Sequence, residues 1–191
     1  MKHSFLIETS AAALFALLCS TGSMQAADPD SGAAAAYCEQ TGGKVIDRAP
    51  FYGTNGPSST WLRLAGTRQF CQYTSSKDGS RIHVLLETLY TTTPTLAALA
   101  YYTPPVLGSC TGNPASCYCS QLGGSDLFGG INAAGGGWVG RGSIDAVLEA
   151  CIFPDMSSID SWGLTYKSDG IIRGIDLTTV LRYTPPAGAA K

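Results

Sequence analysis

The chain has 191 residues, of which 14% are charged, and its formal net charge at pH 7 is -2. This balance supplies no basic surface for nucleic acid or for an anionic membrane, and we expect neither as a partner. The length allows either one sizeable domain or two small ones.

Residues 1–26 have the pattern of a secretory signal peptide. Lys2 precedes a short apolar run, and small residues follow up to the expected cleavage beside Ala26 or Ala27. The run is too short to span a bilayer, and no later segment has the roughly 20 apolar residues that a spanning helix needs. We therefore predict a secreted or periplasmic protein without a membrane span.

Six cysteines follow the predicted signal peptide. An even number of cysteines in an exported chain indicates disulfide bonds, although six cysteines allow about 15 connectivities. The six are Cys38, Cys71, Cys110, Cys117, Cys119 and Cys151.

An internal repeat narrows this choice. Residues 37–43 align with residues 118–124 at an offset of 81 (118 minus 37), and residues 95–105 align with residues 176–186 at the same offset. Self-similarity at a fixed offset indicates that each copy is one structural unit. The sequence therefore predicts two tandem modules.

The predicted modules span residues 33–105 and 114–186, and a linker occupies residues 106–113. We expect each to be a small α+β unit with short helices and a small antiparallel sheet. Units of this size bury little apolar surface, which is the usual reason why small secreted domains carry disulfides. The class is therefore α+β, as two disulfide-linked modules in tandem.

The repeat also predicts the pairing of the cysteines. One disulfide closes each module, and the two remaining cysteines pair with each other between the linker and the second module. Each module disulfide closes a loop of thirty-odd residues, for which chain entropy suggests roughly 3 to 4 kcal/mol of stabilisation. The predicted pairs are Cys38 with Cys71, Cys119 with Cys151, and Cys110 with Cys117.

The second module begins with a clear helix signal. Asn113 is a suitable N-cap, Pro114 suits the first helical position, and Gly123 is expected to end the helix. Residues two apart on a helix differ by about 200° in direction, so Cys117 and Cys119 are expected to face opposite ways.

The later elements are predicted from their patterns. We expect strands after the double glycine and around the second cysteine, a helix with an apolar stripe, a final β-branched strand, and a glycine-rich loop. The ranges are 44–48, 68–73 and 149–153 for the strands, 157–166 for the helix, 176–183 for the final strand and 128–142 for the loop.

Two tryptophans are candidates for a binding surface. Trp61 and Trp138 stand in segments flanked by serine or glycine, and we expect both side chains to be exposed.

The second module resembles a known family, the bacterial exported domain catalogued as domain of unknown function 333, whose members are often labelled haemolysins. The resemblance rests on "NPASCYCSQLGG" at residues 113–124 and "ACIFPDMSSIDSWGLTY" at residues 150–166. The first module matches in part, at residues 37–43 and at Cys71. The resemblance implies a fold and says little about activity.

Few residues of the expected mature chain suit catalysis. His83 is its one histidine, and because the repeat places Asp160 at the equivalent position we interpret His83 as a side chain on a helix surface. Glu149, Asp155 and Asp160 have no spacing that fixes a carboxylate pair, and we assign the two aspartates to a turn and a helix start.

A zinc site drawn from four cysteines is not favoured. Export favours oxidation of the thiols, and sulfurs on one helix that point apart do not converge on a tetrahedral ion. We therefore predict neither a metal nor a cofactor. The four are Cys110, Cys117, Cys119 and Cys151.

Our hypothesis is a secreted, non-enzymatic protein that binds an unknown extracellular or envelope macromolecule or takes part in its assembly. Duplication would supply two similar surfaces. Protease inhibition is the alternative, since small disulfide-linked modules suit that task, and cytolysis or hydrolysis ranks below it. Head-to-tail self-assembly is a further hypothesis, because residues 184–191 resemble residues 103–110.

Overall fold

The computed structural model describes residues 31–106, 108–126, 134–140 and 143–187, with side chains from residue 147 in the last range. The predicted signal peptide, residues 1–26, lies outside the described residues. None of the helices in the described ranges is long and apolar enough to cross a membrane.

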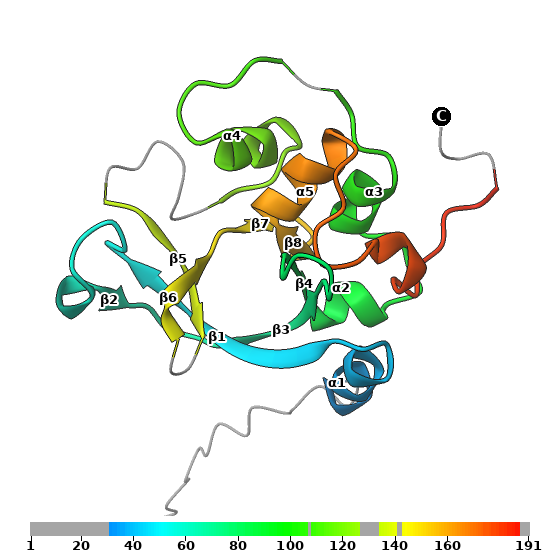
Figure 1. The fold of residues 1–191 in the computed structure, drawn as a ribbon, viewed down its shortest axis with the longest axis horizontal. Coiled ribbons are helices and arrows are strands. Elements are labelled where there is room, and N and C mark those ends of the chain that lie inside the picture. The colour runs from blue at the N-terminus through cyan, green and yellow to red at the C-terminus, as the bar shows by residue number, and fades with distance from the viewer. Residues whose placement is uncertain (1–30, 107, 127–133, 141–142, 188–191) are drawn as a thin grey trace, which may run out of the picture.

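One antiparallel sheet contains strands from both halves of the chain, in the order β6-β5-β1-β3-β4-β8-β7, with β2 paired to β1. The strands at the two ends of this order, β6 and β7, are consecutive in the chain and are separated by Glu149 alone. The sheet therefore curls into a nearly closed barrel, seen as a ring in Figure 1. The bounds are β1 Lys44–Tyr52, β2 Leu62–Arg63, β3 Arg68–Thr74, β4 Arg81–Leu85, β5 Gly136–Gly140, β6 Ser143–Leu148, β7 Ala150–Ile152 and β8 Ser158–Asp160.

The shared sheet confirms the α+β class and corrects the prediction of two tandem modules. Strand β1 pairs with β5 from Arg48 opposite Gly140 to Tyr52 opposite Gly136, and β4 pairs with β8 at Val84 and Ile159. Separate modules would each leave unpaired strand edges, which pairing between the halves removes.

The helices lie on one side of the barrel. Their bounds are α1 Ser31–Gln40, α2 Leu86–Tyr90, α3 Leu96–Tyr102, α4 Pro114–Gln121 and α5 Ser161–Ser168, with 3-10 turns η1 Ser58–Thr60 and η2 Leu177–Thr179. In Figure 1, α2, α3 and α5 lie beside β4, β7 and β8, while α1 lies beside the end of β1, and none of the described α-helices lies beside β2. Among the described residues, no α-helix covers the side of the barrel that carries β2.

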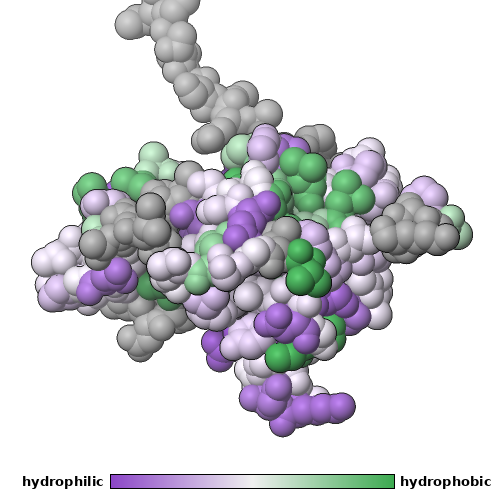
Figure 2. Space-filling model, turned by 90° about the horizontal axis from the view of Figure 1, so that it is seen from above, coloured by the Kyte–Doolittle hydropathy of each residue, from purple (hydrophilic) through white to green (hydrophobic). Residues whose placement is uncertain are grey.

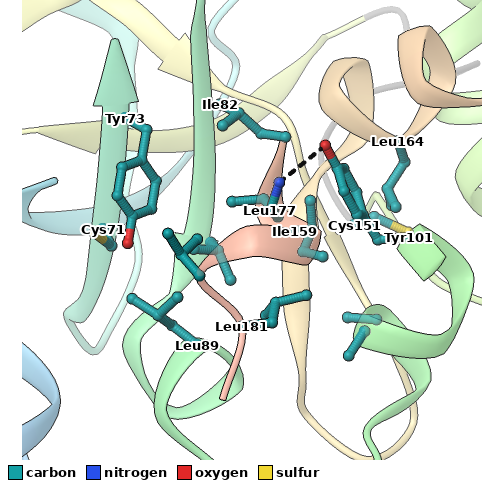
Figure 3. Close-up of a cluster of buried hydrophobic side chains, with 14 of the residues drawn as sticks. Cys71, Tyr73, Ile82, Leu89, Tyr101, Cys151, Ile159, Leu164, Leu177 and Leu181 are labelled. Atoms are coloured by element: carbon teal, nitrogen blue, oxygen red, sulfur yellow. Dashed lines mark hydrogen bonds between the residues drawn. The ribbon is translucent and has the colours of Figure 1, made fainter. Parts of the chain in front are cut away.

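The larger core lies between the helices and the outer face of β3, β4 and β8. Figure 3 shows Tyr73 and Ile82 from the sheet and Leu164 and Leu177 from α5 and η2 within this cluster. The Tyr101 hydroxyl accepts a hydrogen bond of 3.3 Å from the backbone N–H of Leu177. Burial of these side chains attaches the helical layer to the barrel.

A second core fills the barrel. Its side chains come from five strands around the ring, and they contact one another inside it: Phe70, Leu85, Trp138, Leu148 and Ala150.

Trp138 belongs to this inner core, so the prediction of an exposed Trp138 is wrong. The side chain is 8% exposed, and its ring centroid lies 5.8 Å from that of Phe70. Residues 136–140 of the predicted loop form strand β5, while its residues 128–133 and 141–142 lie outside the described residues. The glycines suit close packing, because a Cβ on Gly137 would lie 2.4 Å from a Val147 side-chain carbon.

The three disulfides are those that the repeat predicts. The Cα–Cα distances are 5.7 Å for Cys38–Cys71, 5.6 Å for Cys119–Cys151 and 5.8 Å for Cys110–Cys117.

The double glycines lie against the two module disulfides. A Cβ on Gly43 would lie 2.2 Å from the Cys71 sulfur, and one on Gly124 would lie 2.4 Å from the Cys151 sulfur. These glycines are required because the backbone passes so close to the sulfur atoms.

Two predicted elements take other forms. Residues 158–160 of the predicted helix are strand β8, since Ile159 pairs with Val84 and covers the core, and the helix starts at Ser161 with Asp160 as its N-cap. The final segment is the turn η2 and not a strand, because the Asp176 carboxylate accepts the Thr178 backbone N–H and starts a 3-10 turn.

Candidate functional site

A cluster of polar side chains lies on the inner side of the barrel. Gln72 pairs with His83 across β3 and β4, and the register of Val84 with Ile159 puts His83 opposite Asp160 across β4 and β8. His83 precedes the inner-core residue Leu85 by two positions, so the alternation of a strand places both on the inner face. The interpretation of His83 as a helix-surface residue is therefore wrong.

The ring of His83 lies among three polar side chains. Its Nε2 lies 3.1 Å from Nη2 of Arg48 and 3.0 Å from Oε1 of Gln72, and its Nδ1 lies 3.4 Å from Oδ2 of Asp160. The backbone N–H of His83 also donates to that carboxylate at 2.6 Å.

Arg48 is a buried cation behind this histidine. The residue is 3% exposed, and its Nη1 donates a hydrogen bond to the backbone carbonyl of Trp138 at 3.1 Å. Burial lowers the pKa of Arg48 to about 10, and the charge of Asp160 partly offsets this effect. The arginine therefore joins the inner core to the polar cluster.

A cavity of about 300 Å³ opens beside the cluster. We call it the charged cavity, and its polar and aromatic lining consists of Arg81, His83, Glu149, Asp160, Trp162 and Arg173. Val147 and Leu148 add an apolar wall. Cationic, anionic and aromatic groups therefore meet at one end of the barrel, which is an arrangement typical of small-molecule sites.

Glu149 is the residue that joins the two ends of the sheet order. Both of its carboxylate oxygens accept from Nδ2 of Asn113, at 3.0 and 3.1 Å. Burial raises the pKa of the Glu149 carboxyl, and the hydrogen bond from Asn113 opposes this shift.

This pKa shift predicts a pH-dependent effect of Glu149→Gln. The folded protein holds the Glu149 proton more tightly than the unfolded chain does. Ionisation of Glu149 therefore lowers the free energy of unfolding as pH rises from about 4.3 through the raised pKa. The variant lacks the charge, and its free energy of unfolding relative to wild type should increase between about pH 4 and about pH 7. Urea unfolding at both pH values measures the difference. Glu39→Gln, at an exposed position of α1, is the control, and a difference that does not change with pH would contradict the prediction.

A second cleft lies on the side of the barrel that carries β2. Its volume is about 600 Å³, and we call it the Trp61 cleft. Apolar and aromatic side chains line it together with several hydrogen-bonding groups: Asp47, Ala49, Phe51, Ser58, Ser59, Trp61, Arg63, Thr67 and Val139, with Gly140.

Trp61 is a fixed, half-buried wall of this cleft. Its Nε1–H donates to the Gly56 carbonyl at 2.8 Å, and its ring meets the Phe51 ring edge to face with centroids 6.1 Å apart. Trp138 lies in the inner core, so the structure does not bring the two predicted binding-surface tryptophans together.

Sequence reasoning missed the cluster at His83, although one signal for it was present. The repeat places His83 and Asp160 at equivalent positions, and equivalent strands that pair antiparallel bring such positions face to face. For Arg48 and Gln72, the available signal was the alternation of side-chain direction along a strand, which indicates the residues that share one face of the sheet. The described residues contain no group of three or more potential ligands that could hold a metal ion.

No family model matches the chain, and comparisons with curated proteins and with solved structures find no significant match. The resemblance of the second half to domain of unknown function 333 stays a prediction.

Proposed function

We propose that the chain is an exported, non-enzymatic protein that binds a neutral extracellular or envelope polysaccharide in the Trp61 cleft. The observation that carries this proposal is the cleft itself, an aromatic-walled hollow lined by residues of β1, η1, β2 and β5.

The lining of the cleft supports a hydroxyl-rich, uncharged partner. Trp61 and Phe51 offer apolar surface for the C–H faces of sugar rings. The hydroxyls of Ser58 and Ser59 and the charged groups of Asp47 and Arg63 can hydrogen-bond to sugar hydroxyls. Because the two charges are opposite, they favour a neutral partner over a highly charged one.

The distribution of hydropathy also favours a local site. The face seen in Figure 2 carries its hydrophobic residues in small separate groups among hydrophilic ones. Recognition through one defined cleft suits such a surface better than recognition through a broad apolar patch.

Export and the absence of catalysis are parts of the same proposal. Three disulfides support an oxidising compartment, either secreted or periplasmic. The contacts of the His83 ring with Arg48, Gln72 and Asp160 support a structural role for this histidine.

Trp61→Ala tests the site. Purified mature protein is incubated with insoluble cellulose, chitin and mannan, and the bound fraction is measured after sedimentation. Wild type should bind at least one of them, and the variant about tenfold more weakly, since one lost aromatic contact of about 1.4 kcal/mol is a factor of ten. Tyr52→Ala is the matched control, because Tyr52 is an exposed aromatic residue of β1 outside the cleft lining.

Three outcomes would contradict the proposed function: no binding to any neutral polysaccharide, equal binding by wild type and Trp61→Ala, or turnover of a glycan, peptide or ester substrate that a point variant abolishes. Inhibition of a protease or leakage of liposomes would favour the alternatives.

A further inference from the structure

Two arginines of the charged cavity have no ion-pair partner among the described residues. Arg81 is exposed at the start of β4, and the Arg173 guanidinium lies 5.0 Å above the Tyr166 ring. Within those residues the ion pairs are His83 with Asp160 and Lys167 with Asp176, which involve neither arginine. Their guanidinium donors are therefore available to a ligand.

The two carboxylates of the same cavity are already engaged. Asp160 accepts the backbone N–H of His83 and that of Gly163, and both oxygens of Glu149 accept from Asn113. Asp160 is also the N-cap of α5, where the helix dipole favours negative charge. Both carboxylates are therefore engaged with other groups of the protein and do not neutralise the two arginines by direct contact.

The guanidinium donors of Arg81 and Arg173 favour an anion. In the lining, Arg81 and Arg173 stand against the two engaged carboxylates of Asp160 and Glu149. Outside the lining, Arg48 lies behind His83, and the charge of Asp126 acts on Glu149. Guanidinium groups match the planar oxygen pair of a carboxylate, which they bind with two parallel hydrogen bonds.

The remaining lining suits the organic part of a ligand. Trp162, Val147 and Leu148 provide aromatic and apolar surface, and a volume of about 300 Å³ is within the range of small-molecule sites. A ligand that fills this space would bury apolar atoms against these side chains.

We propose that the charged cavity binds a small organic anion, whose carboxylate is held by Arg81 and Arg173 and whose apolar part packs on Trp162. This site is separate from the Trp61 cleft and does not depend on polysaccharide binding.

Benzoate is a suitable probe, since it joins a carboxylate to an apolar ring, and inorganic phosphate is the comparison that has charge without apolar surface. Titration of the mature protein, followed by the NMR signal of the Trp162 indole N–H and by calorimetry, should show saturable binding of benzoate that is tighter than that of phosphate. Arg81→Gln and Arg173→Gln should each weaken benzoate binding about tenfold, as expected for the loss of a charge-assisted hydrogen bond.

Arg63→Gln is the matched control, because it changes the net charge equally but lies in the Trp61 cleft. It should alter benzoate affinity less than about twofold. Arg81→Lys keeps the charge and loses the planar fork, so an intermediate affinity is expected. Circular dichroism checks that each variant is folded.

The proposal is overturned if benzoate fails to bind, if phosphate binds as tightly as benzoate, or if Arg63→Gln weakens binding as much as the two cavity variants. Failure of Trp61→Ala to affect polysaccharide binding would leave this inference intact, and loss of benzoate binding in the cavity variants would leave the polysaccharide proposal intact.

Discussion

Replacement of Trp138 by alanine is expected to lower the free energy of unfolding by about 3 to 5 kcal/mol, the cost usual for removing a buried tryptophan. The indole lies inside the barrel among side chains from four other strands, and it packs on Phe70. The surrounding strands are joined by backbone hydrogen bonds and cannot collapse far into the space that the ring leaves. Urea denaturation followed by circular dichroism measures the change.

Trp61→Ala is the control for this prediction, since it removes the same side chain from a half-buried position in the open cleft. We expect a smaller loss of stability, on the order of 1 kcal/mol. Equal losses in the two variants would show that Trp138 is not part of a closed inner core.

Removal of the Cys119–Cys151 disulfide, by replacing both cysteines with alanine, should destabilise the fold by about 4 kcal/mol. This value follows from the chain entropy of a loop whose ends are 32 residues apart. Both sulfurs are fully buried, so the variant also leaves a cavity in the larger core. Unfolding experiments on the oxidised proteins measure the loss.

The Cys110–Cys117 disulfide provides the comparison. Its cysteines are only 7 residues apart and Cys110 is exposed, so the same double replacement should cost about 2.4 kcal/mol, clearly less than the loss of Cys119–Cys151. The Cys38–Cys71 disulfide, with a separation of 33 residues and two buried sulfurs, should behave like Cys119–Cys151. The opposite order of effects would contradict this account of the disulfides.

The position of the candidate sites depended on how the two halves combine. The sequence singled out Trp61 and Trp138 by the same reasoning, from their glycine- and serine-rich surroundings. The two residues differ in burial because Trp138 lies on β5, which pairs with β6 on one side and β1 on the other. Every second side chain of such a strand points into the barrel. No local pattern in the sequence distinguishes such a strand from a flexible glycine-rich loop.

The amino-acid sequence by itself determined the features that depend on neighbouring residues or on the repeat. These are the start of α4 at the Asn113 cap, the three cysteine pairs, and the double glycines that end α1 and α4. Helix caps are local interactions, and the repeat compares two copies of one pattern, so neither requires knowledge of the whole fold.

Only the tertiary structure decided that the halves share one barrel, that residues 136–140 form a strand, and that His83 meets Asp160 and Arg48. Strand pairing joins residues far apart in the chain, and any strand of one half could pair with an edge of the other. The choice among these pairings depends on how much apolar surface the complete sheet buries and on how many of its backbone groups form hydrogen bonds. No single segment specifies either quantity.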